Sequence, residues 1–111
     1  MKLDDINNFI GDIDLELLDQ LLKGRFNDRH RILEIGCGQG RNIIPFLNLT
    51  KTIYGIDVDE KNIALCKIIA TSLGGNPTFF SKAPANILPF ENGFFDAIIN
   101  CRVMHFAKNT L

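Results

Sequence analysis

Apolar and polar positions alternate along the chain in a way that divides it into strands and helices in turn. Four short apolar runs have the length and composition of buried strands: 31–35, 52–56, 78–81 and 95–100. Apolar residues that recur every three or four positions predict helices over 12–23, 42–47 and 60–73, and a further helix from about Val103. This order of elements predicts an α/β fold with a parallel sheet and right-handed crossovers.

The helix limits follow from capping residues. Asp12 suits the N-cap of the first helix, and Gly24 suits its end. The third helix ends at Gly74 and Gly75, and its apolar face is formed by Ile63, Cys66, Ala70 and Leu73. On that face we expect Cys66 to be a small buried hydrophobic residue.

Charge and hydropathy exclude several kinds of partner. The 111 residues suit one small domain, and a net charge of −1 offers no electrostatic surface for nucleic acid or an anionic membrane. No apolar run approaches the roughly 20 residues of a membrane span, and two acids interrupt the N-terminus where a signal peptide would be apolar. Cys37, Cys66 and Cys101 show neither a disulfide framework nor zinc spacing, which favours the cytoplasm.

Three glycines, Gly36, Gly38 and Gly40, follow the first apolar strand and precede a helix. Because glycine has no Cβ, the chain can turn sharply there and a ligand can approach the backbone. The following helix directs its free N–H groups to the same place. The pattern thus predicts a ligand-binding turn, although an ordinary glycine-rich turn between strand and helix has the same appearance.

Asp57 ends the second strand and follows Gly36 by about twenty residues. In a doubly wound sheet the ends of these two strands are neighbours, and ligands bind in the crevice outside them. A carboxylate there can accept hydrogen bonds from both hydroxyls of a ribose. The alternative is a surface aspartate that caps the helix after it.

The glycine spacing is G-x-G-x-G and not the dinucleotide pattern G-x-G-x-x-G, and an acid, Glu34, stands two residues before the first glycine. In this respect the chain resembles the class I S-adenosylmethionine-dependent methyltransferases over about 31–106. The resemblance is carried by Glu34-Ile35-Gly36-Cys37-Gly38-Gln39-Gly40, Tyr54-Gly55-Ile56-Asp57-Val58, Ile87-Leu88-Pro89-Phe90 and Gly93-Phe94-Phe95-Asp96-Ala97-Ile98-Ile99.

The resemblance implies a set of cofactor-binding residues. The turn from Gly36 to Gly40, with Cys37 inside it and Glu34 before it, would hold the methionine and ribose parts of S-adenosylmethionine or of its product S-adenosylhomocysteine. Asp57 would bind the ribose hydroxyls, and Val58 would pack against the adenine. The backbone of Ala85 or the amide of Asn86 would replace the aspartate with which the family binds the adenine amino group. Asn100 would lie near the methionine group. Asp96 would be structural.

No catalytic residue is assigned, because the sulfonium is already a good leaving group and positioning an acceptor in line supplies most of what the reaction needs. His105 is the one candidate for a general base, and an ordinary packing or surface histidine is the alternative. Arg41 is either a contact for the cofactor's carboxylate or a solvated arginine at a helix start.

The chain departs from the family pattern in length, because members of the family build a seven-stranded sheet. We therefore expect 1–111 to form a single truncated cofactor-binding domain of a Rossmann-like methyltransferase fold, with about four parallel strands, flanking helices and an N-terminal helical segment over 1–30. We expect little methyl transfer by these residues alone, a small-molecule acceptor, and a homodimer formed through an unpaired edge of the fourth strand. A non-catalytic nucleoside-binding module, an inactive remnant and a nicotinamide-dependent oxidoreductase are the alternatives.

Overall fold

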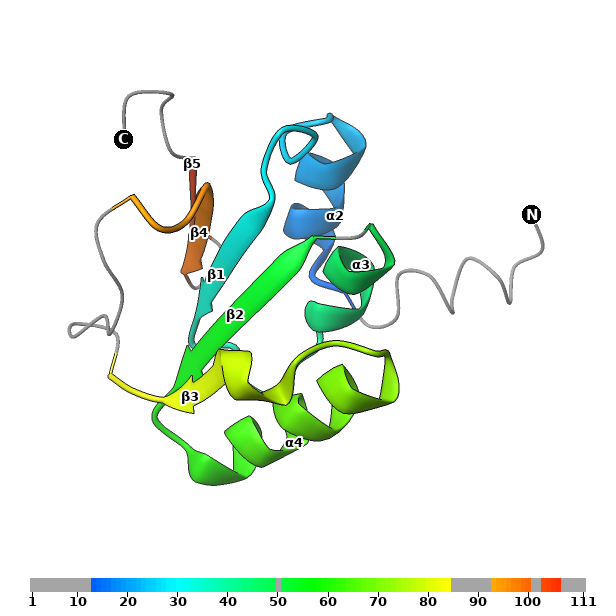
Figure 1. The fold of residues 1–111 in the computed structure, drawn as a ribbon. Coiled ribbons are helices and arrows are strands. Elements are labelled where there is room, and N and C mark those ends of the chain that lie inside the picture. The colour runs from blue at the N-terminus through cyan, green and yellow to red at the C-terminus, as the bar shows by residue number, and fades with distance from the viewer. Residues whose placement is uncertain (1–12, 50, 85–92, 101–102, 107–111) are drawn as a thin grey trace.

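A computed structural model describes residues 13–49, 51–84, 93–100 and 103–106 (Figure 1). One five-stranded sheet in the order β3-β2-β1-β4-β5 forms its centre. The strands are β1 (Arg31–Ile35), β2 (Thr52–Asp57), β3 (Phe80–Lys82), β4 (Ala97–Asn100) and β5 (Val103–Phe106). The helices are α2 (Leu15–Leu22), α3 (Ile43–Asn48), α4 (Glu60–Ser72) and the 3₁₀ turn η1 (Pro77–Phe79).

Four parallel strands carry the architecture, as the sequence predicts. β1 lies in the middle and pairs with β2 on one side and with β4 on the other, from Ile32 opposite Ala97 to Ile35 opposite Asn100. β3 pairs with the far side of β2. The carboxyl ends of β1, β2 and β4 therefore meet at one end of the sheet, where ligands bind in folds of this type.

The helix expected from Val103 is wrong, because Val103–Phe106 forms a strand antiparallel to β4. Asn100 pairs with Val103 and Ala97 pairs with Phe106. So short a connection between paired strands suits an antiparallel hairpin, whereas a crossover to a parallel strand needs a dozen or more residues. The outer edge of β4 is therefore covered by the chain itself, and the unpaired edge on which the predicted homodimer depended is absent.

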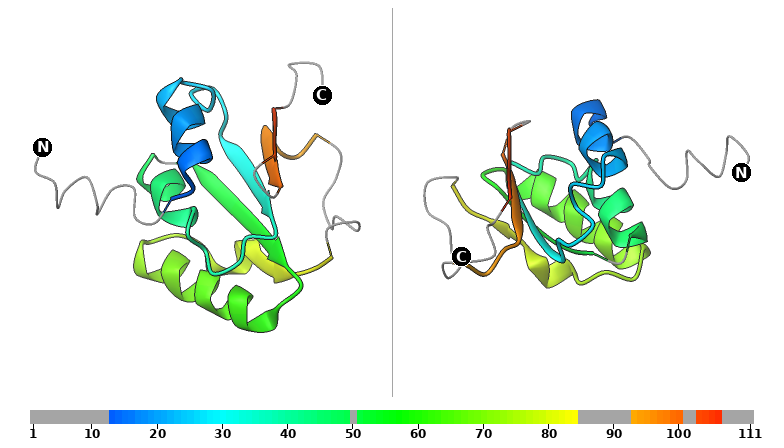
Figure 2. Two further views of the ribbon diagram at one scale, coloured as in Figure 1. Left: turned by 180° about the vertical axis from the view of Figure 1, so that it is seen from behind. Right: turned by 90° about the horizontal axis from the view of Figure 1, so that it is seen from above.

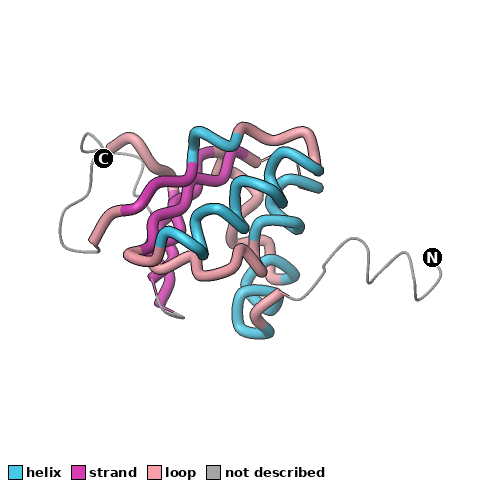
Figure 3. Tube along the Cα trace, turned by 90° about the horizontal axis from the view of Figure 1, so that it is seen from below, coloured by secondary structure: helices cyan, strands magenta, loops and turns pink. Residues whose placement is uncertain are grey.

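In the described part of the chain, α2, α3 and α4 lie on the same face of the sheet (Figures 2 and 3). The larger core fills the space between helices and sheet, and includes Leu17, Phe26, Ile32, Phe46, Cys66 and Phe80. The opposite face of the sheet has a smaller cluster of Leu33, Ile35, Ile56 and Phe95. Ile32 of β1 enters the larger cluster, whereas Leu33 and Ile35 enter the smaller one, so this strand has apolar side chains on both faces of the sheet.

Two element limits differ from the predictions for local reasons. The N-cap of α2 is Asp14, whose carboxylate accepts hydrogen bonds from the N–H groups of Glu16 and Leu17; Asp12 lies outside the described residues. The first half of the predicted third strand is the η1 turn, which begins where Asn76 accepts a hydrogen bond from the N–H of Thr78.

The predicted apolar face of α4 needs one correction. Ile63, Cys66 and Ala70 are buried, but Leu73 follows the helix and is 42% exposed. Gly24 and Gly74, with φ of 76° and 78°, end α2 and α4 as expected.

Candidate functional site

The glycine turn connects β1 to α3 and is fixed to the end of β2. Gly36, Gly38 and Gly40 all have positive φ, at 70°, 57° and 87°. The N–H groups of Gly36 and Cys37 both donate to the carbonyl oxygen of Ile56, at 2.8 and 3.0 Å. The turn therefore continues the pairing of β1 with β2 beyond the last strand residue.

The three glycines differ in what surrounds them. A Cβ placed on Gly36 or Gly38 would meet nothing within 4 Å, so the turn has open space beside both. A Cβ on Gly40 would lie 2.8 Å from Cδ1 of Ile43 and 3.2 Å from Sγ of Cys66. Gly36 and Gly38 thus leave the backbone accessible to a ligand, whereas Gly40 is needed for packing against α3 and α4.

Asp57 lies directly against the turn, as predicted. Its Oδ2 accepts a hydrogen bond from the N–H of Gly38 at 2.9 Å, and its Oδ1 accepts from the N–H of Asp59 at 2.8 Å. The N-cap of α4 is Asp59, which accepts from the N–H of Lys61, so Asp57 is not the helix cap of the alternative interpretation. Nδ2 of Asn62 also donates to Oδ1, at 3.5 Å. A carboxylate offers about four acceptor positions, so Asp57 retains capacity for a further donor such as a hydroxyl.

Glu34 is buried on the helix side of β1 and is only 6% exposed. Its Oε2 accepts a hydrogen bond from Nδ2 of Asn42 at 2.7 Å, while its Oε1 is buried and has no partner among the described residues. Burial disfavours the charged form and raises the pKa of Glu34 to about 7, against the opposing effect of the Asn42 hydrogen bond. Beside the turn there is therefore a carboxyl group with one unsatisfied oxygen.

Asn42 was predicted only as a helix start, and its second contact was missed. Its Oδ1 accepts a hydrogen bond from the backbone N–H of Asp14 at 3.0 Å. Asn42 thus joins the beginning of α2 to the carboxyl of Glu34. An asparagine at the first position of a helix normally caps that helix, so the sequence gives no sign of this long-range role.

Two buried thiols lie at the turn, that of Cys37 within it and that of Cys66 on α4. Cys37 and Cys66 are both buried, their Sγ atoms are 3.6 Å apart, and Sγ of Cys66 donates to the carbonyl oxygen of Gly38 at 3.2 Å. The hydrogen bond with Cys66 and burial together raise the pKa of the Cys37 thiol. Cys66 is buried as the helix pattern predicted, but it is also a polar contact of the turn.

The other predicted site residues that the structure describes lie at the ends of strands, at a helix start and in β5. Val58 follows β2 and is 65% exposed, and Asn100 ends β4 opposite Ile35. Arg41 is exposed at the start of α3. His105 lies in β5 and pairs with Ile98 of β4, whereas a helix was expected at this position. Ala85 and Asn86 lie outside the described residues.

Asp96 has a structural position at the other end of the sheet, as predicted. Its Oδ2 accepts hydrogen bonds from the backbone N–H groups of His30 and Arg31, both at 2.9 Å. These donors, that of Arg31 foremost, lower the pKa of the Asp96 carboxyl. Asp96 fastens the segment before β4 to the start of β1.

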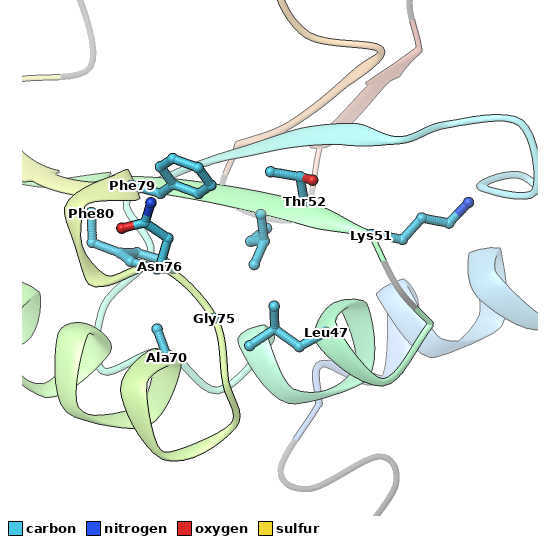
Figure 4. A pocket seen from close by; sticks show the side chains of 9 residues that line it. Leu47, Lys51, Thr52, Ala70, Gly75, Asn76, Phe79 and Phe80 are labelled. Carbon is cyan, nitrogen blue, oxygen red and sulfur yellow. The ribbon is translucent and has the colours of Figure 1, made fainter.

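A separate cavity of about 130 Å³ lies at the opposite end of β2 (Figure 4). It is formed where α3 and α4 end and β2 begins, and is lined by Leu47, Lys51, Thr52, Ile53, Ala70, Gly75, Asn76, Phe79 and Phe80. Pockets for cofactors and drug-sized ligands usually have about 300–1,000 Å³. This cavity is too small for a nucleoside cofactor and contains none of the predicted site residues.

Among residues 13–49, 51–84, 93–100 and 103–106, no three His, Cys, Asp or Glu side chains are grouped so as to hold a metal ion. No helix in this part of the chain has the length and hydropathy needed to cross a bilayer.

Comparison with known proteins places this geometry in a family context. A family model described as a methyltransferase domain matches residues 32–111. Among curated proteins, an uncharacterised methyltransferase, YcgJ of Bacillus subtilis, is 32% identical over 73 residues. A ubiquinone biosynthesis O-methyltransferase of Bartonella bacilliformis is 34% identical over 74 residues. The matches cover 66% and 67% of this chain but 28% and 29% of those proteins, so the chain spans less than a third of their length.

Solved structures show the same fold. The crystal structure of YcgJ superposes with a TM-score of 0.66 at 24% identity, covering 78% of this chain and 37% of that one. An S-adenosylmethionine-dependent methyltransferase of Clostridium acetobutylicum gives a TM-score of 0.62 at 18% identity, covering 87% and 41%.

Proposed function

Since the chain belongs to the class I S-adenosylmethionine-dependent methyltransferases, we propose that its glycine turn and Asp57 bind S-adenosylmethionine for methyl transfer to a small molecule. The hydrogen bond from the N–H of Gly38 to Asp57 carries the proposal. It brings the turn after β1 and the acid at the end of β2 together at the carboxyl ends of the parallel strands.

The residues present fit this cofactor in two respects. Open space beside Gly36 and Gly38 lets the flat side of a ligand approach the backbone. The buried, unpartnered Oε1 of Glu34 lacks a donor, and the cofactor's methionine part carries an ammonium group that can donate. We assign Glu34 and the turn, including Cys37 and Gly40, to the methionine and ribose parts.

The other assignments remain proposals of the same kind. The ribose hydroxyls belong to Asp57, whose carboxylate has acceptor capacity left. The exposed side chain of Val58, at the end of β2, offers an apolar surface for the adenine. Asn100 ends β4 at the same end of the sheet and is assigned to the methionine side.

The cofactor, when bound, supplies an activated methyl group and leaves as S-adenosylhomocysteine. This chain's part is to hold the cofactor so that an acceptor lines up with the methyl carbon, because positioning accounts for most of the acceleration. No catalytic residue is assigned: His105 of β5 is the candidate for the base that an acceptor with a proton to lose would need, and an ordinary packing or surface histidine is the alternative. A net charge of −1 favours a small-molecule acceptor over nucleic acid, and the cysteine spacing favours a cytoplasmic location.

Titration calorimetry with S-adenosylhomocysteine tests the assignment. Asp57→Ala leaves ribose hydroxyls without an acceptor, which costs about 1–3 kcal/mol and weakens binding by about 5- to 150-fold. Asp59→Ala is the matched control, since it removes an acid two residues away that caps α4 and accepts no hydrogen bond from the turn.

We expect wild-type affinity from Asp59→Ala and no binding of NAD by either variant or the wild type. Equal affinity of Asp57→Ala and the wild type would remove the ribose assignment. Binding of NAD in preference to S-adenosylhomocysteine would favour an oxidoreductase instead.

A further inference from the structure

We infer that the thiols of Cys37 and Cys66 can be oxidised to a disulfide, and that this disulfide weakens the binding of a ligand by the glycine turn. Cys37 lies inside the turn and Cys66 lies on α4, so the bond would join two elements that are far apart in sequence. Their Sγ atoms are 3.6 Å apart, and both side chains are buried, at 3% and 0% exposure.

The geometry allows the bond with small movements. A disulfide has an S–S length of about 2.05 Å, so each sulfur needs to move by about 0.8 Å along the line that joins them. Two glycines make room for the pair, because a Cβ on Gly55 would lie 2.9 Å from Sγ of Cys37 and one on Gly40 would lie 3.2 Å from Sγ of Cys66. The thiols are thus enclosed in a space that exists only because positions 40 and 55 have no side chain.

The bond needs a two-electron oxidant, and hydrogen peroxide is the smallest hydroperoxide that supplies one. One thiol takes an oxygen atom from hydrogen peroxide to give a sulfenic acid, and one water is released. The second thiol then attacks that sulfur, the S–S bond forms, and a second water leaves. Gly36 and Gln39 of the same turn are exposed, so the pair lies just below the protein surface.

Oxidation changes the turn through Gly38. The thiol of Cys66 donates its hydrogen to the carbonyl oxygen of Gly38 at 3.2 Å, and a disulfide has no hydrogen to donate. The N–H of the same residue donates to Asp57 at 2.9 Å. The disulfide therefore removes one of two contacts that fix Gly38 and draws Cys37 towards α4. This step rests on the proposed function, because it matters for ligand binding only if the turn holds the cofactor.

Peptide mapping tests the bond without reference to binding. The full chain carries Cys101→Ser, so that the third thiol takes no part, and is treated with hydrogen peroxide, alkylated and digested with trypsin. Cleavage after Arg31, Arg41, Lys61 and Lys67 isolates each cysteine in its own peptide, 32–41 and 62–67. We expect these peptides to be linked, with a mass about 2 Da below the sum of the two thiol peptides, and to separate on treatment with dithiothreitol.

Calorimetry with S-adenosylhomocysteine then tests the consequence. Peroxide should weaken binding at least tenfold in the Cys101→Ser chain, and dithiothreitol should restore it. A chain with Cys66→Ser as well should keep its affinity through the same treatment, since it cannot form the bond.

Each alternative result has a distinct meaning. Thiols that remain open to alkylation, or a sulfinic acid on one cysteine without linkage, would overturn the disulfide. Linked peptides with unchanged affinity would overturn the effect on the turn. A reduced chain that does not bind S-adenosylhomocysteine, but still forms the link, would instead overturn the proposed function and leave the thiol pair standing.

Discussion

Because the carboxyl of Glu34 is buried, we predict that its contribution to the free energy of unfolding falls as pH rises. Glu34 is 6% exposed, accepts one hydrogen bond from Asn42 and has a second oxygen without a partner among the described residues. Glu34→Gln replaces the carboxyl with a neutral group of the same shape, whose oxygen can still accept from Asn42. The substitution therefore removes the ionisation and keeps the packing.

The sign follows from the two pKa values. Burial raises the pKa of Glu34 from 4.5 to about 7 in the folded chain, so between these values the folded state binds more protons than the unfolded state. The stability that Glu34 contributes is fully present below about pH 4.5 and is lost as pH rises through about 7. At about 1.4 kcal/mol for each pH unit, the loss amounts to about 3 kcal/mol.

Urea unfolding of wild type and variant near pH 5 and near pH 8 measures this difference. The two proteins should have similar unfolding free energies at the lower pH, and Glu34→Gln should be more stable by up to about 3 kcal/mol at the higher pH. Glu16→Gln makes the same chemical change at an exposed position on α2 and should leave the pH profile unchanged. Parallel profiles for wild type and Glu34→Gln would refute the argument.

The same carboxyl should couple pH to ligand binding. If the ammonium group of S-adenosylhomocysteine lies beside Glu34, it favours the charged carboxylate and lowers its pKa, so binding near pH 6–7 releases a proton. Calorimetry in buffers of different ionisation enthalpy counts that proton. Glu34→Gln should release none, and an equal release from both proteins would assign the proton to another group.

Three further changes test the turn and its support. Gly38→Ala and Gly40→Ala both place a side chain on a residue with positive φ, which costs about 1–2 kcal/mol. Only Gly40→Ala also overpacks the core, so urea unfolding should show this variant to be less stable than Gly38→Ala by about 1–3 kcal/mol. Gly38→Ala, although more stable, should lose more affinity for S-adenosylhomocysteine in calorimetry. Asp96→Ala should lower the free energy of unfolding by about 1–3 kcal/mol above pH 5, and this difference from wild type should shrink as pH falls through the lowered pKa of Asp96. As a control, Asp19→Ala breaks an exposed ion pair and should lower the free energy of unfolding by about 0–1 kcal/mol.

The parts of the fold that the sequence predicts well are those fixed by local signals. β1 and β2 follow from short apolar runs, and α4 follows from its period and the glycines after it. β5 was missed because the alternation of strands and helices along the chain favoured another helix from Val103, although Val103 and Phe106 are good strand formers and only 101–102 separate the segment from β4. A short connection is itself a signal for a hairpin, and here it outweighs the alternation of elements.

The candidate site likewise contains residues that local sequence signals predict and residues that only the fold shows. The motif residues Gly36, Gly38 and Asp57 are found from spacing, because the topology of a doubly wound sheet fixes where two strands end. The residues that support them are not, because their contacts join positions far apart in the chain: Asp14 with Asn42, and Cys37 with Cys66. Only the fold shows that a helix-start asparagine and a core cysteine both reach the site.

Gly38 shows why these supporting contacts matter for the chemistry. Its N–H donates to Asp57 from β2 and its carbonyl oxygen accepts from Cys66 of α4, while a Cβ at that position would meet open space. A glycine with free space and no such contacts would adopt many conformations, and a ligand would have to order it on binding at the expense of affinity. Two hydrogen bonds from different elements fix the peptide groups on both sides of its Cα in advance and leave the space beside that Cα accessible. Preorganisation of the turn therefore depends on Cys66, a residue outside the motif, and this is the physical reason why a change in the state of a buried thiol should be measurable as a change in cofactor affinity.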